Sequence, residues 1–407
     1  MPAQTLWLVP PPLRLSDAPA PAWGHVARLT DDTGLLGFAR TAIASREHGY
    51  RVQDAARGLL VASREPRPAT QVVALAERYL ACLVHAQDLD GAFHARLGYD
   101  RRWLDEPSTG EPWGHAMWGL GSAAARSTVP WISRAASEAF RLGAHLRSPS
   151  PRAMAFAGLG AAEVLRADPR AAAAADLLAD AATVVGLPGG DPGWAWPEPE
   201  LTYANPALAE VVVAAGDLLG DECLLTEGLR MLAWLCRVQD RDGHLSPVPA
   251  NGLRPADDLC PPNDPGPAEA GRGVTGRGAT AEDHPAPGVQ RPAEVAATAD
   301  ACATAAAVTG DDRWDAALFQ AVAWFLGDND AGAVMYDPLT GGGYDALTVD
   351  GPDRHQGAEA ALALLSTLQH ARTLAARRPG VTGRALRRPA PLGPGRSRVT
   401  GPFGAPT

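Results

Sequence analysis

The stretch Cys82–Gly91, C-L-V-H-A-Q-D-L-D-G, is nearly repeated at Trp234–Gly243, W-L-C-R-V-Q-D-R-D-G. Each copy ends an amphipathic segment with acids, a turn and a glycine that can adopt a positive φ, as at a helix C-terminus. A looser third copy, W-F-L-G-D-N-D-A-G, occupies Trp324–Gly332. Helical segments that recur at such intervals indicate stacked helical hairpins, which form either an open solenoid or a closed ring.

Outward from these repeats, apolar residues spaced three and four apart predict about twelve helices. The first is expected from Leu35, after a possible N-cap at Asp32 or Thr33, and the second follows a loop at His48. No period-two pattern typical of strands is evident between the helices. Six hairpins of two helices close an (α/α)6 toroid, so we predict an all-α fold of this kind. The other predicted helices cover residues 69–87, 114–126, 129–143, 151–166, 171–184, 206–219, 221–239, 292–309, 311–327 and 356–376.

Segments rich in Pro and Gly mark the limits of this domain. Residues 1–32 predict an extended, Pro-rich lead-in, and residues 33–376 form the expected toroid. Within it, residues 258–286 predict a mobile insertion, because a structureless loop of this length is unusual in a compact domain. Residues 377–407, rich in Arg, Pro and Gly, predict a disordered tail.

The composition narrows the possible partners. The 407 residues carry a net charge of -10 without a basic stripe, so we expect no nucleic-acid partner. No apolar run is long enough to span a membrane and no signal peptide is evident, so we expect a cytoplasmic protein. The five cysteines form no C-x-x-C pair and the calcium-loop spacing of an EF-hand is absent, so we expect neither a metal nor a cofactor.

The segment Trp194–Asn205, W-A-W-P-E-P-E-L-T-Y-A-N, combines aromatic rings with carboxylates. Aromatic faces stack on the apolar faces of sugar rings, and carboxyl groups move protons or bind hydroxyls. From these residues alone, a structural loop whose Trp side chains fill a helical core is an equally good interpretation.

Other polar clusters fall at predicted helix starts and turns, where a toroid forms its cleft. Each also has a structural interpretation: Asp54 and Arg57 could be a helix ion pair, Glu294 and Glu359 could favour helix N-termini, and His115 could be a packing residue. The clusters are Gln53–Arg57, Gln87–Pro107, Trp113–Trp118, Gln290–Glu294 and Tyr344–Asp345 with Arg354–Glu359.

Taken together, these motifs resemble a bacterial family of (α/α)6-toroid proteins in the six-hairpin glycosidase and N-acylglucosamine 2-epimerase-like class. Members are often described as glycosyltransferases, because the module occurs fused to or beside glycosyltransferase domains. The resemblance covers about residues 33–375 and implies a carbohydrate-active protein with a possible glycosyltransferase partner. Its motifs are His48–Leu59, Tyr99–Pro107, Gly114–Gly121, Trp194–Asn205, Gly243–Gly252, Gln290–Glu294, Trp324–Asp330, Thr340–Leu347 and His355–Leu365.

The chain departs from the family pattern at several polar positions. Gln53 stands where the family has an acid, Ala204 where it has Asp, and Arg291 where it has Gln. Replacement of these polar residues in the expected cleft is consistent with a divergent family member that has a changed substrate or a reduced catalytic activity. The other departures are His115 and Ala207, where the family has Arg, Ala346, where it has Gly, and Ala360, where it has Ser.

We therefore predict a glycosidase-type protein, leaning toward an enzyme, that acts on an oligo- or polysaccharide in a Trp-lined cleft. Glu198 and Glu294 are the predicted pair of carboxyl groups, one to protonate the leaving oxygen and one to activate water or attack. Asp54, Asp345 and Glu359 are the alternatives for these roles. The predicted substrate-binding residues are Trp103, Trp194, Trp196, Tyr203, Asn205, Arg57, His115, Gln290 and Gln356.

Two other functions stay open from the sequence. One is a sugar 2-epimerase, which needs facing acid–base histidines, with His48, His115, His244 and His355 as candidates. The other is a non-catalytic glycan-binding module that serves a glycosyltransferase.

Overall fold

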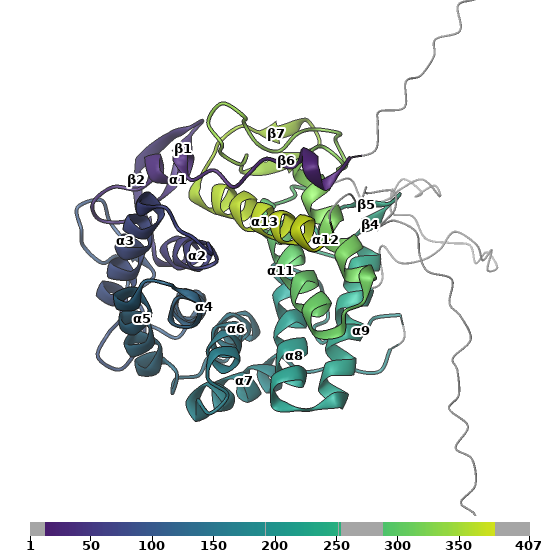
Figure 1. Cartoon of the computed structure of the whole chain (residues 1–407), viewed down its shortest axis with the longest axis horizontal. Helices are drawn as coiled ribbons and strands as arrows, with labels where there is room; N and C mark the ends of the chain where they lie inside the picture. Colours follow the sequence, from purple (N-terminus) through teal and green to yellow (C-terminus); the bar gives the residue numbers. More distant parts are fainter. Residues whose placement is uncertain (1–12, 192, 251, 254–287, 379–407) are drawn as a thin grey trace, which may run out of the picture.

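Six helices surround the centre of the molecule and others pack outside them, as the computed structural model shows (Figure 1). The structure describes residues 13–191, 193–250, 252–253 and 288–378. Within these residues the chain forms twelve α-helices and three small antiparallel sheets. The predicted insertion at 258–286 and nearly all of the predicted tail lie outside the described residues.

Five consecutive hairpins each pair an inner helix with an outer helix. The predicted (α/α)6 toroid is confirmed, because the sixth inner helix, α13 (Ala358–Arg377), lies between α11 and α2 and closes the ring. The five hairpins are α2 (Val52–Ser63) with α3 (Thr70–Ala86), α4 (Glu111–Arg126) with α5 (Pro130–Gly143), α6 (Pro151–Ala167) with α7 (Ala172–Val185), α8 (Asn205–Leu219) with α9 (Glu222–Val238), and α11 (Pro292–Thr309) with α12 (Asp312–Phe325).

The start of the chain completes the sixth hairpin. The 3-10 turn η1 (Leu15–Asp17) and the short helix α1 (Gly24–Leu29) both pack against α13. Val26 and Leu29 are fully buried there. The prediction of an extended lead-in is therefore wrong for η1 and α1. These elements have few apolar residues, but those residues pack the beginning of the domain against its last helix, α13.

The helix predicted from Leu35 is also wrong, because residues 36–51 form a β-hairpin. Strands β1 (Leu36–Arg40) and β2 (Ile43–Arg51) pair antiparallel, and β3 (Arg96–Leu97) adds to β2. Thr41 in the two-residue turn has a φ of 51°, which a right-handed helix does not accommodate. Two further strand pairs, β4 (Asp240–Arg241) with β5 (His244–Leu245) and β6 (Ala346–Thr348) with β7 (Gly351–Asp353), were likewise not predicted.

Inner and outer helices differ in composition as their positions require. Inner helices are buried on nearly every face, and α8 is buried continuously from Asn205 to Gly216. Glycines let α4 and α6 approach closely: a Cβ on Gly121 or Gly160 would overlap the backbone of the facing helix. The outer helix α9, in contrast, buries only a single stripe of side chains.

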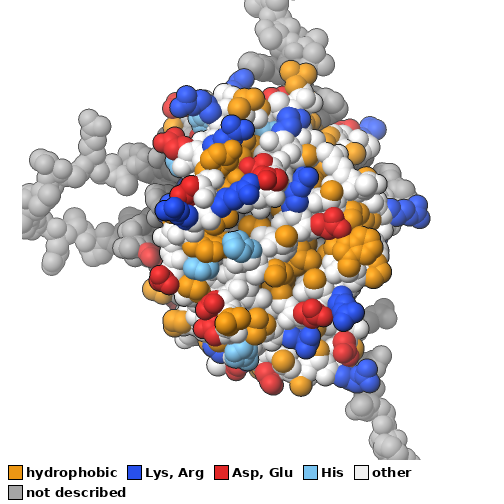
Figure 2. Space-filling view, turned by 90° about the vertical axis from the view of Figure 1, so that its left-hand side faces the viewer, with side chains coloured by type: hydrophobic (Ala, Val, Ile, Leu, Met, Phe, Trp, Pro, Cys, Tyr) orange, Lys and Arg blue, Asp and Glu red, His pale blue; other side chains and the backbone are white. Residues whose placement is uncertain are grey.

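The outer surface shows no dominant charge on the face that carries α3 and α5. Basic and acidic side chains intermingle with hydrophobic ones over that face (Figure 2). Among the described residues, no helix combines the length and apolar character needed to cross a membrane.

Candidate functional site

A cavity of about 370 Å³ opens where the inner helices begin. Every inner helix contributes to it near its N-terminus, so the six helices run in the same direction around the centre. On α2, α4, α11 and α13 the lining residues extend over eight or nine residues of each helix, which corresponds to a depth of about 10 Å. The polar and aromatic lining residues are Arg51, Gln53, Arg57, Glu111, His115, Trp118, Phe156, Thr202, Tyr203, Arg291, Glu294, Asp300, Glu359 and Ser366.

Glu294, in the first turn of α11, is the most deeply buried acid in the upper part of this cavity. Its Oε1 accepts a hydrogen bond from the backbone N–H of Ala204, with an N–O distance of 2.5 Å. Its Oε2 is buried and has no hydrogen-bond partner among the described residues. Burial raises the pKa of Glu294 to about 7, so much of this carboxyl group is protonated at neutral pH.

Glu359, in the first turn of α13, lines the same cavity in the opposite protonation state. Its Oε1 accepts a hydrogen bond of 2.6 Å from Nη1 of Arg57. Burial disfavours its charged form, but the charges of Arg57 and Arg51 outweigh burial and hold the pKa of Glu359 below its ordinary value. Glu294 and Glu359 therefore favour opposite protonation states near neutrality within the same cavity.

Asp54 lies behind the cavity wall and organises the arginines. Both of its oxygens accept hydrogen bonds from Arg51, at 2.7 and 3.1 Å, and Nη1 of Arg57 is 3.8 Å away. Its side chain is fully buried and does not line the cavity. Burial raises its pKa even though the arginines partly offset this effect. Asp54 thus positions Arg51 and Arg57 and is out of reach of a ligand in the cavity.

The aromatic wall comes from α4 and α6. The His115 ring stacks on Phe156 with centroids 3.8 Å apart, and Trp118 stacks on the same Phe156 at 5.9 Å. Burial and the charges of Arg57 and Arg51 lower the pKa of His115 well below its ordinary value, so its imidazole is neutral. The predicted substrate-binding residues included His115; Trp118 was named only as part of the cluster Trp113–Trp118, and Phe156 was missed.

Tyr203 forms another part of the wall and is half exposed. Its hydroxyl donates a hydrogen bond to Oε1 of Glu111, at the start of α4. The guanidinium of Arg152 lies over its ring, 4.7 Å from the centroid. These contacts hold the Tyr203 ring at the cavity, and its role in substrate binding stays a prediction.

Glu198 lies outside the cavity lining, so the structure does not bring the predicted pair Glu198 and Glu294 together there. Both carboxylate oxygens of Glu198 accept hydrogen bonds from Arg152, at 2.7 and 2.9 Å. Arg152 also donates to the backbone oxygen of Tyr203 and to Thr202. The Glu198 carboxylate therefore fastens the loop before α8 to the start of α6.

The predicted tryptophan platform is likewise absent from the cavity lining. Trp194 and Trp196 are buried and pack on Trp234, with centroid distances of 5.0 and 6.1 Å. Trp103 stacks on His94 at 4.5 Å, also away from the cavity. For Trp194 and Trp196, the interpretation as core-filling residues is the correct one.

The predicted polar residues Asn205, Gln290, Gln356 and Asp345 also lie outside the cavity lining. Each holds local structure: Asn205 accepts a hydrogen bond from the Thr202 backbone, and Asp345 accepts one from the Gly357 backbone. The amide groups of Gln290 bond to Ser246, Asp330 and Trp324, and those of Gln356 bond to Thr340 and Asp337.

Of the four histidines considered for epimerase chemistry, the structure places only His115 in the cavity lining. His244 bonds to Asp330 at 2.7 Å, and His355 accepts a hydrogen bond from the Thr41 backbone at 2.9 Å. His48 packs against Phe38 at the β-hairpin. The described residues therefore offer no facing histidine pair in this cavity.

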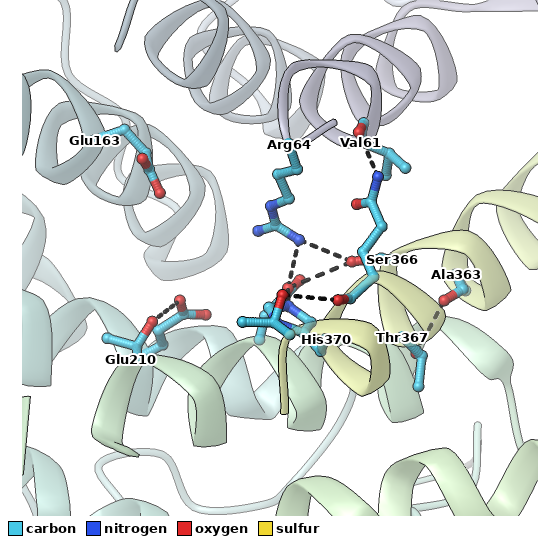
Figure 3. Close-up of polar contacts among 12 residues, drawn as sticks. Val61, Arg64, Glu163, Glu210, Ala363, Ser366, Thr367 and His370 are labelled. Atoms are coloured by element: carbon cyan, nitrogen blue, oxygen red, sulfur yellow. Dashed lines mark hydrogen bonds and ion pairs between the residues drawn. The ribbon is translucent and has the colours of Figure 1, made fainter. Parts of the chain in front are cut away.

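At the deep end of the cavity lies a buried ionic cluster that was not predicted from the sequence (Figure 3). Oδ1 of Asp300 accepts hydrogen bonds of 2.6 Å from Arg64 and from His370, and Arg64 also donates to Ser366 at 2.8 Å. Burial opposes ionisation, but Arg64 and His370 lower the pKa of Asp300 to about 2. The sequence signal that could have indicated this cluster was Asp300, an acid in the middle of α11, where most residues are small and apolar.

Glu210 on α8 is a second buried acid, close enough to Asp300 to be affected by its charge. Its Oε1 accepts a hydrogen bond from Thr304, and its Oε2 is buried without a partner among the described residues. Burial and the charge of Asp300 raise the pKa of Glu210 to about 8.

No group of three or more His, Cys, Asp or Glu in the described part of the chain is arranged to hold a metal ion.

No protein-family model matches the sequence of this chain, and neither does any curated protein. The fold of the chain, however, matches solved structures. A sugar epimerase from a ruminal bacterium is similar over 85% of this chain and 95% of its own, with 13% identity and a TM-score of 0.59. A cellobiose 2-epimerase from Bacillus thermoamylovorans covers 86% and 95%, with 10% identity and a TM-score of 0.60. A cellulase of C. cellulolyticium in complex with cellobiose covers 83% and 87%, with 11% identity and a TM-score of 0.51. At these identities, the likeness establishes the shared six-hairpin toroid alone.

Proposed function

We propose that this protein is a glycosidase-type enzyme whose active site is the central cavity. The observation that carries the proposal is the pair Glu294 and Glu359, which line one cavity in opposite protonation states. Hydrolysis of a glycosidic bond needs such a pair, because an acid must protonate the leaving oxygen while a carboxylate acts on the other side of the sugar. The carbohydrate-acting toroids of the same fold add to this support.

In the proposed mechanism, Glu294 donates its proton to the glycosidic oxygen. Glu359, held ionised by Arg57, activates a water molecule or attacks the anomeric carbon. Inversion of the anomeric configuration corresponds to carboxyl groups about 6.5–9.5 Å apart and retention to about 5–5.5 Å, so the anomeric form of the first product distinguishes the two routes.

The aromatic wall provides the binding surface. The stacked rings of His115, Phe156 and Trp118 face the cavity with Tyr203, and flat rings of this kind complement the apolar face of a pyranose. This wall takes the place of the tryptophan platform expected from the sequence.

A glycosyltransferase partner and a cytoplasmic location stay predictions from the sequence.

The test is incubation of the protein with α- and β-linked oligosaccharides, with new reducing ends as the measurement. We expect cleavage of at least one linkage, and loss of that cleavage in Glu294→Gln and Glu359→Gln. A change of sugar configuration without bond cleavage, seen by NMR, would instead indicate an epimerase. Binding without any turnover would indicate the glycan-binding module.

A further inference from the structure

The central cavity is closed at its deep end by polar side chains from all six inner helices. On each helix, or at its C-cap in α2, a polar residue follows the last residue that lines the cavity. Because the six helices run in the same direction, these residues lie further from the mouth than the lining does. They are Arg64 after Val61, Arg126 after Trp118, Glu163 after Phe156, Glu210 after Ala207, Thr304 after Asp300, and His370 after Ser366.

Hydrogen bonds among these residues and the deepest lining residues join the inner helices below the cavity. Figure 3 shows Arg64, Glu163, Glu210 and Ser366 directed from different helices toward the same central space. We call this set of side chains the cavity floor. Among the described residues, a ligand therefore reaches the cavity from the mouth. The bonds are Arg126 to Glu163 at 2.5 and 2.9 Å, Thr304 to Glu210 at 2.7 Å, and Arg64 to Asp300 and Ser366 at 2.6 and 2.8 Å.

The two carboxyl groups of the proposed active site stand a short way above this floor. Asp300 follows Glu294 by six residues on α11, and Ser366 follows Glu359 by seven on α13, which corresponds to about 9–10 Å of helix. The cavity volume of about 370 Å³ is also near the small end of the range for ligand cavities, about 300–1,000 Å³. A glycosidic bond held at the carboxyl groups therefore has room for only a short sugar segment between it and the floor.

The surfaces that can bind this segment lie deep in the cavity. Trp118 is the eighth residue of α4 and Phe156 the sixth of α6, so their stacked rings are more than one turn inside the helix starts. Asp300 accepts its hydrogen bonds from Arg64, Ser366 and His370 through Oδ1. A carboxylate has a second acceptor oxygen, so Asp300, which lines the cavity, can also accept sugar hydroxyls.

We propose that the cavity binds the end of a glycan chain and that the enzyme removes sugars from that end. The terminal unit stacks on Trp118 and Phe156, and its hydroxyls bond to Asp300 and Ser366 at the floor. The inference rests on the proposed function and adds the substrate class, a chain with a free end. The step itself is hydrolysis: the anomeric C–O bond breaks, the leaving oxygen gains a proton, and the hydroxyl of one water joins the anomeric carbon.

The test compares linear tetra- to hexasaccharides with free ends and the same chains blocked at the non-reducing end as a benzylidene acetal, at the reducing end as an aryl glycoside, or at both. We expect the wild type to release mono- or disaccharide from the first time point. Calorimetry with Glu294→Gln measures binding without turnover. A chain blocked at the bound end should bind at least about tenfold more weakly than the free chain, and the arm that loses binding identifies that end.

A second arm fills the space above the floor. Ala297 lines the cavity one turn below Glu294 on α11, so Ala297→Phe should weaken both binding and cleavage at least about tenfold with an unchanged melting temperature. Ala297→Leu makes the same test with a smaller side chain if the Phe variant does not fold. Ala179→Phe, at an exposed position on α7, is the matched control.

The outcomes separate this inference from the glycosidase function. A ladder of internal products, equal binding of a chain blocked at both ends, or wild-type binding in Ala297→Phe overturns the inference and leaves the glycosidase function standing. Binding that requires a free end, without cleavage of any linkage, overturns only the glycosidase function. Neither binding nor cleavage of any chain overturns both.

Discussion

Oε1 of Glu294 accepts a hydrogen bond from the backbone N–H of Ala204, which links the start of α11 to the start of the neighbouring helix α8. Ala204 has φ 48° and ψ 28°, a left-handed conformation that a non-glycine residue rarely adopts. Strained backbone of this kind is concentrated at functional sites, where the surrounding structure enforces it. The hydrogen bond occupies one oxygen of Glu294, and the other oxygen is buried without a partner among the described residues.

Glu294→Gln should separate catalysis from folding. The amide oxygen of Gln can accept the Ala204 N–H, so the variant should fold and bind sugar as the wild type does. Loss of a general acid should reduce turnover by about 10²–10⁴-fold. Steady-state hydrolysis and calorimetry measure the two effects. Glu138→Gln, an exposed acid on α5, is the control, and turnover of Glu294→Gln within tenfold of the wild type would contradict the assigned role.

The pH dependence of turnover should form a plateau with its upper end near 7. Glu294 must be protonated, and its pKa is raised to about 7, so activity should fall as the pH rises above that value. Glu359 must be ionised, and its lowered pKa places the acid limb below the ordinary Glu range, at more acidic pH than about 4.5. Initial rates from pH 3 to 9 measure both limbs. A rate that still increases above pH 8 would exclude Glu294 as the proton donor.

Folding stability should decrease with rising pH because of Glu210. Its pKa is raised from 4.5 to about 8, so between these values the folded state binds more protons than the unfolded state, and stability falls as the pH rises. Below about 4.5 the group is protonated in both states and has no effect. Urea unfolding at pH 5 and pH 8.5 should show a smaller difference in Glu210→Gln than in the wild type, whereas Glu227→Gln, a surface acid, should change nothing.

The sequence predicted the ring because its outer helices carry a periodic apolar stripe, while inner helices such as α8 and α11 are long segments of mostly small and apolar residues. It failed where local signals were weak: the hairpin at residues 36–51 depends on a turn at Thr41, and α1 is too short for a periodic pattern to be recognised. Closure of the ring by α1 and α13 depends on contacts between distant parts of the chain, which no local pattern encodes.

For the site, the sequence indicated the right helix starts but not the side chains that face inward. Glu294, Glu359, His115 and Tyr203 were predicted and line the cavity. Trp194 was also predicted, yet it packs in the core, because composition alone does not distinguish a ring that faces a ligand from one that fills a helical layer. Arg152 was missed because its contacts to the loop before α8 are fixed only by tertiary structure.

Glu198→Gln should mainly lower the stability of the fold and should affect the turnover rate less. The substitution removes the charge that pairs with Arg152, a largely buried guanidinium, and we expect a loss of about 1–3 kcal/mol in the free energy of unfolding. Turnover should fall less than in Glu294→Gln. Urea titration and hydrolysis rates measure the two effects, with Glu227→Gln, which breaks the surface pair with Arg230, as the control. A loss of turnover with unchanged stability would return Glu198 to the list of catalytic candidates.

The ionic cluster at the deep end of the cavity should stabilise the ring where its first and last inner helices meet. Arg64 is the C-cap residue of α2, Asp300 lies on α11, and Ser366 and His370 lie on α13, so the cluster joins segments from both ends of the domain. Asp300→Asn leaves the buried Arg64 without a carboxylate and should cost about 3–5 kcal/mol, whereas Arg64→Met leaves Asp300 with His370 as a partner and should cost less. The double variant removes both charges, so it should cost clearly less than the sum of the two. Urea unfolding of the four proteins gives this coupling energy, and effects that add to within about 0.5 kcal/mol would show that the pair does not hold the ring closed.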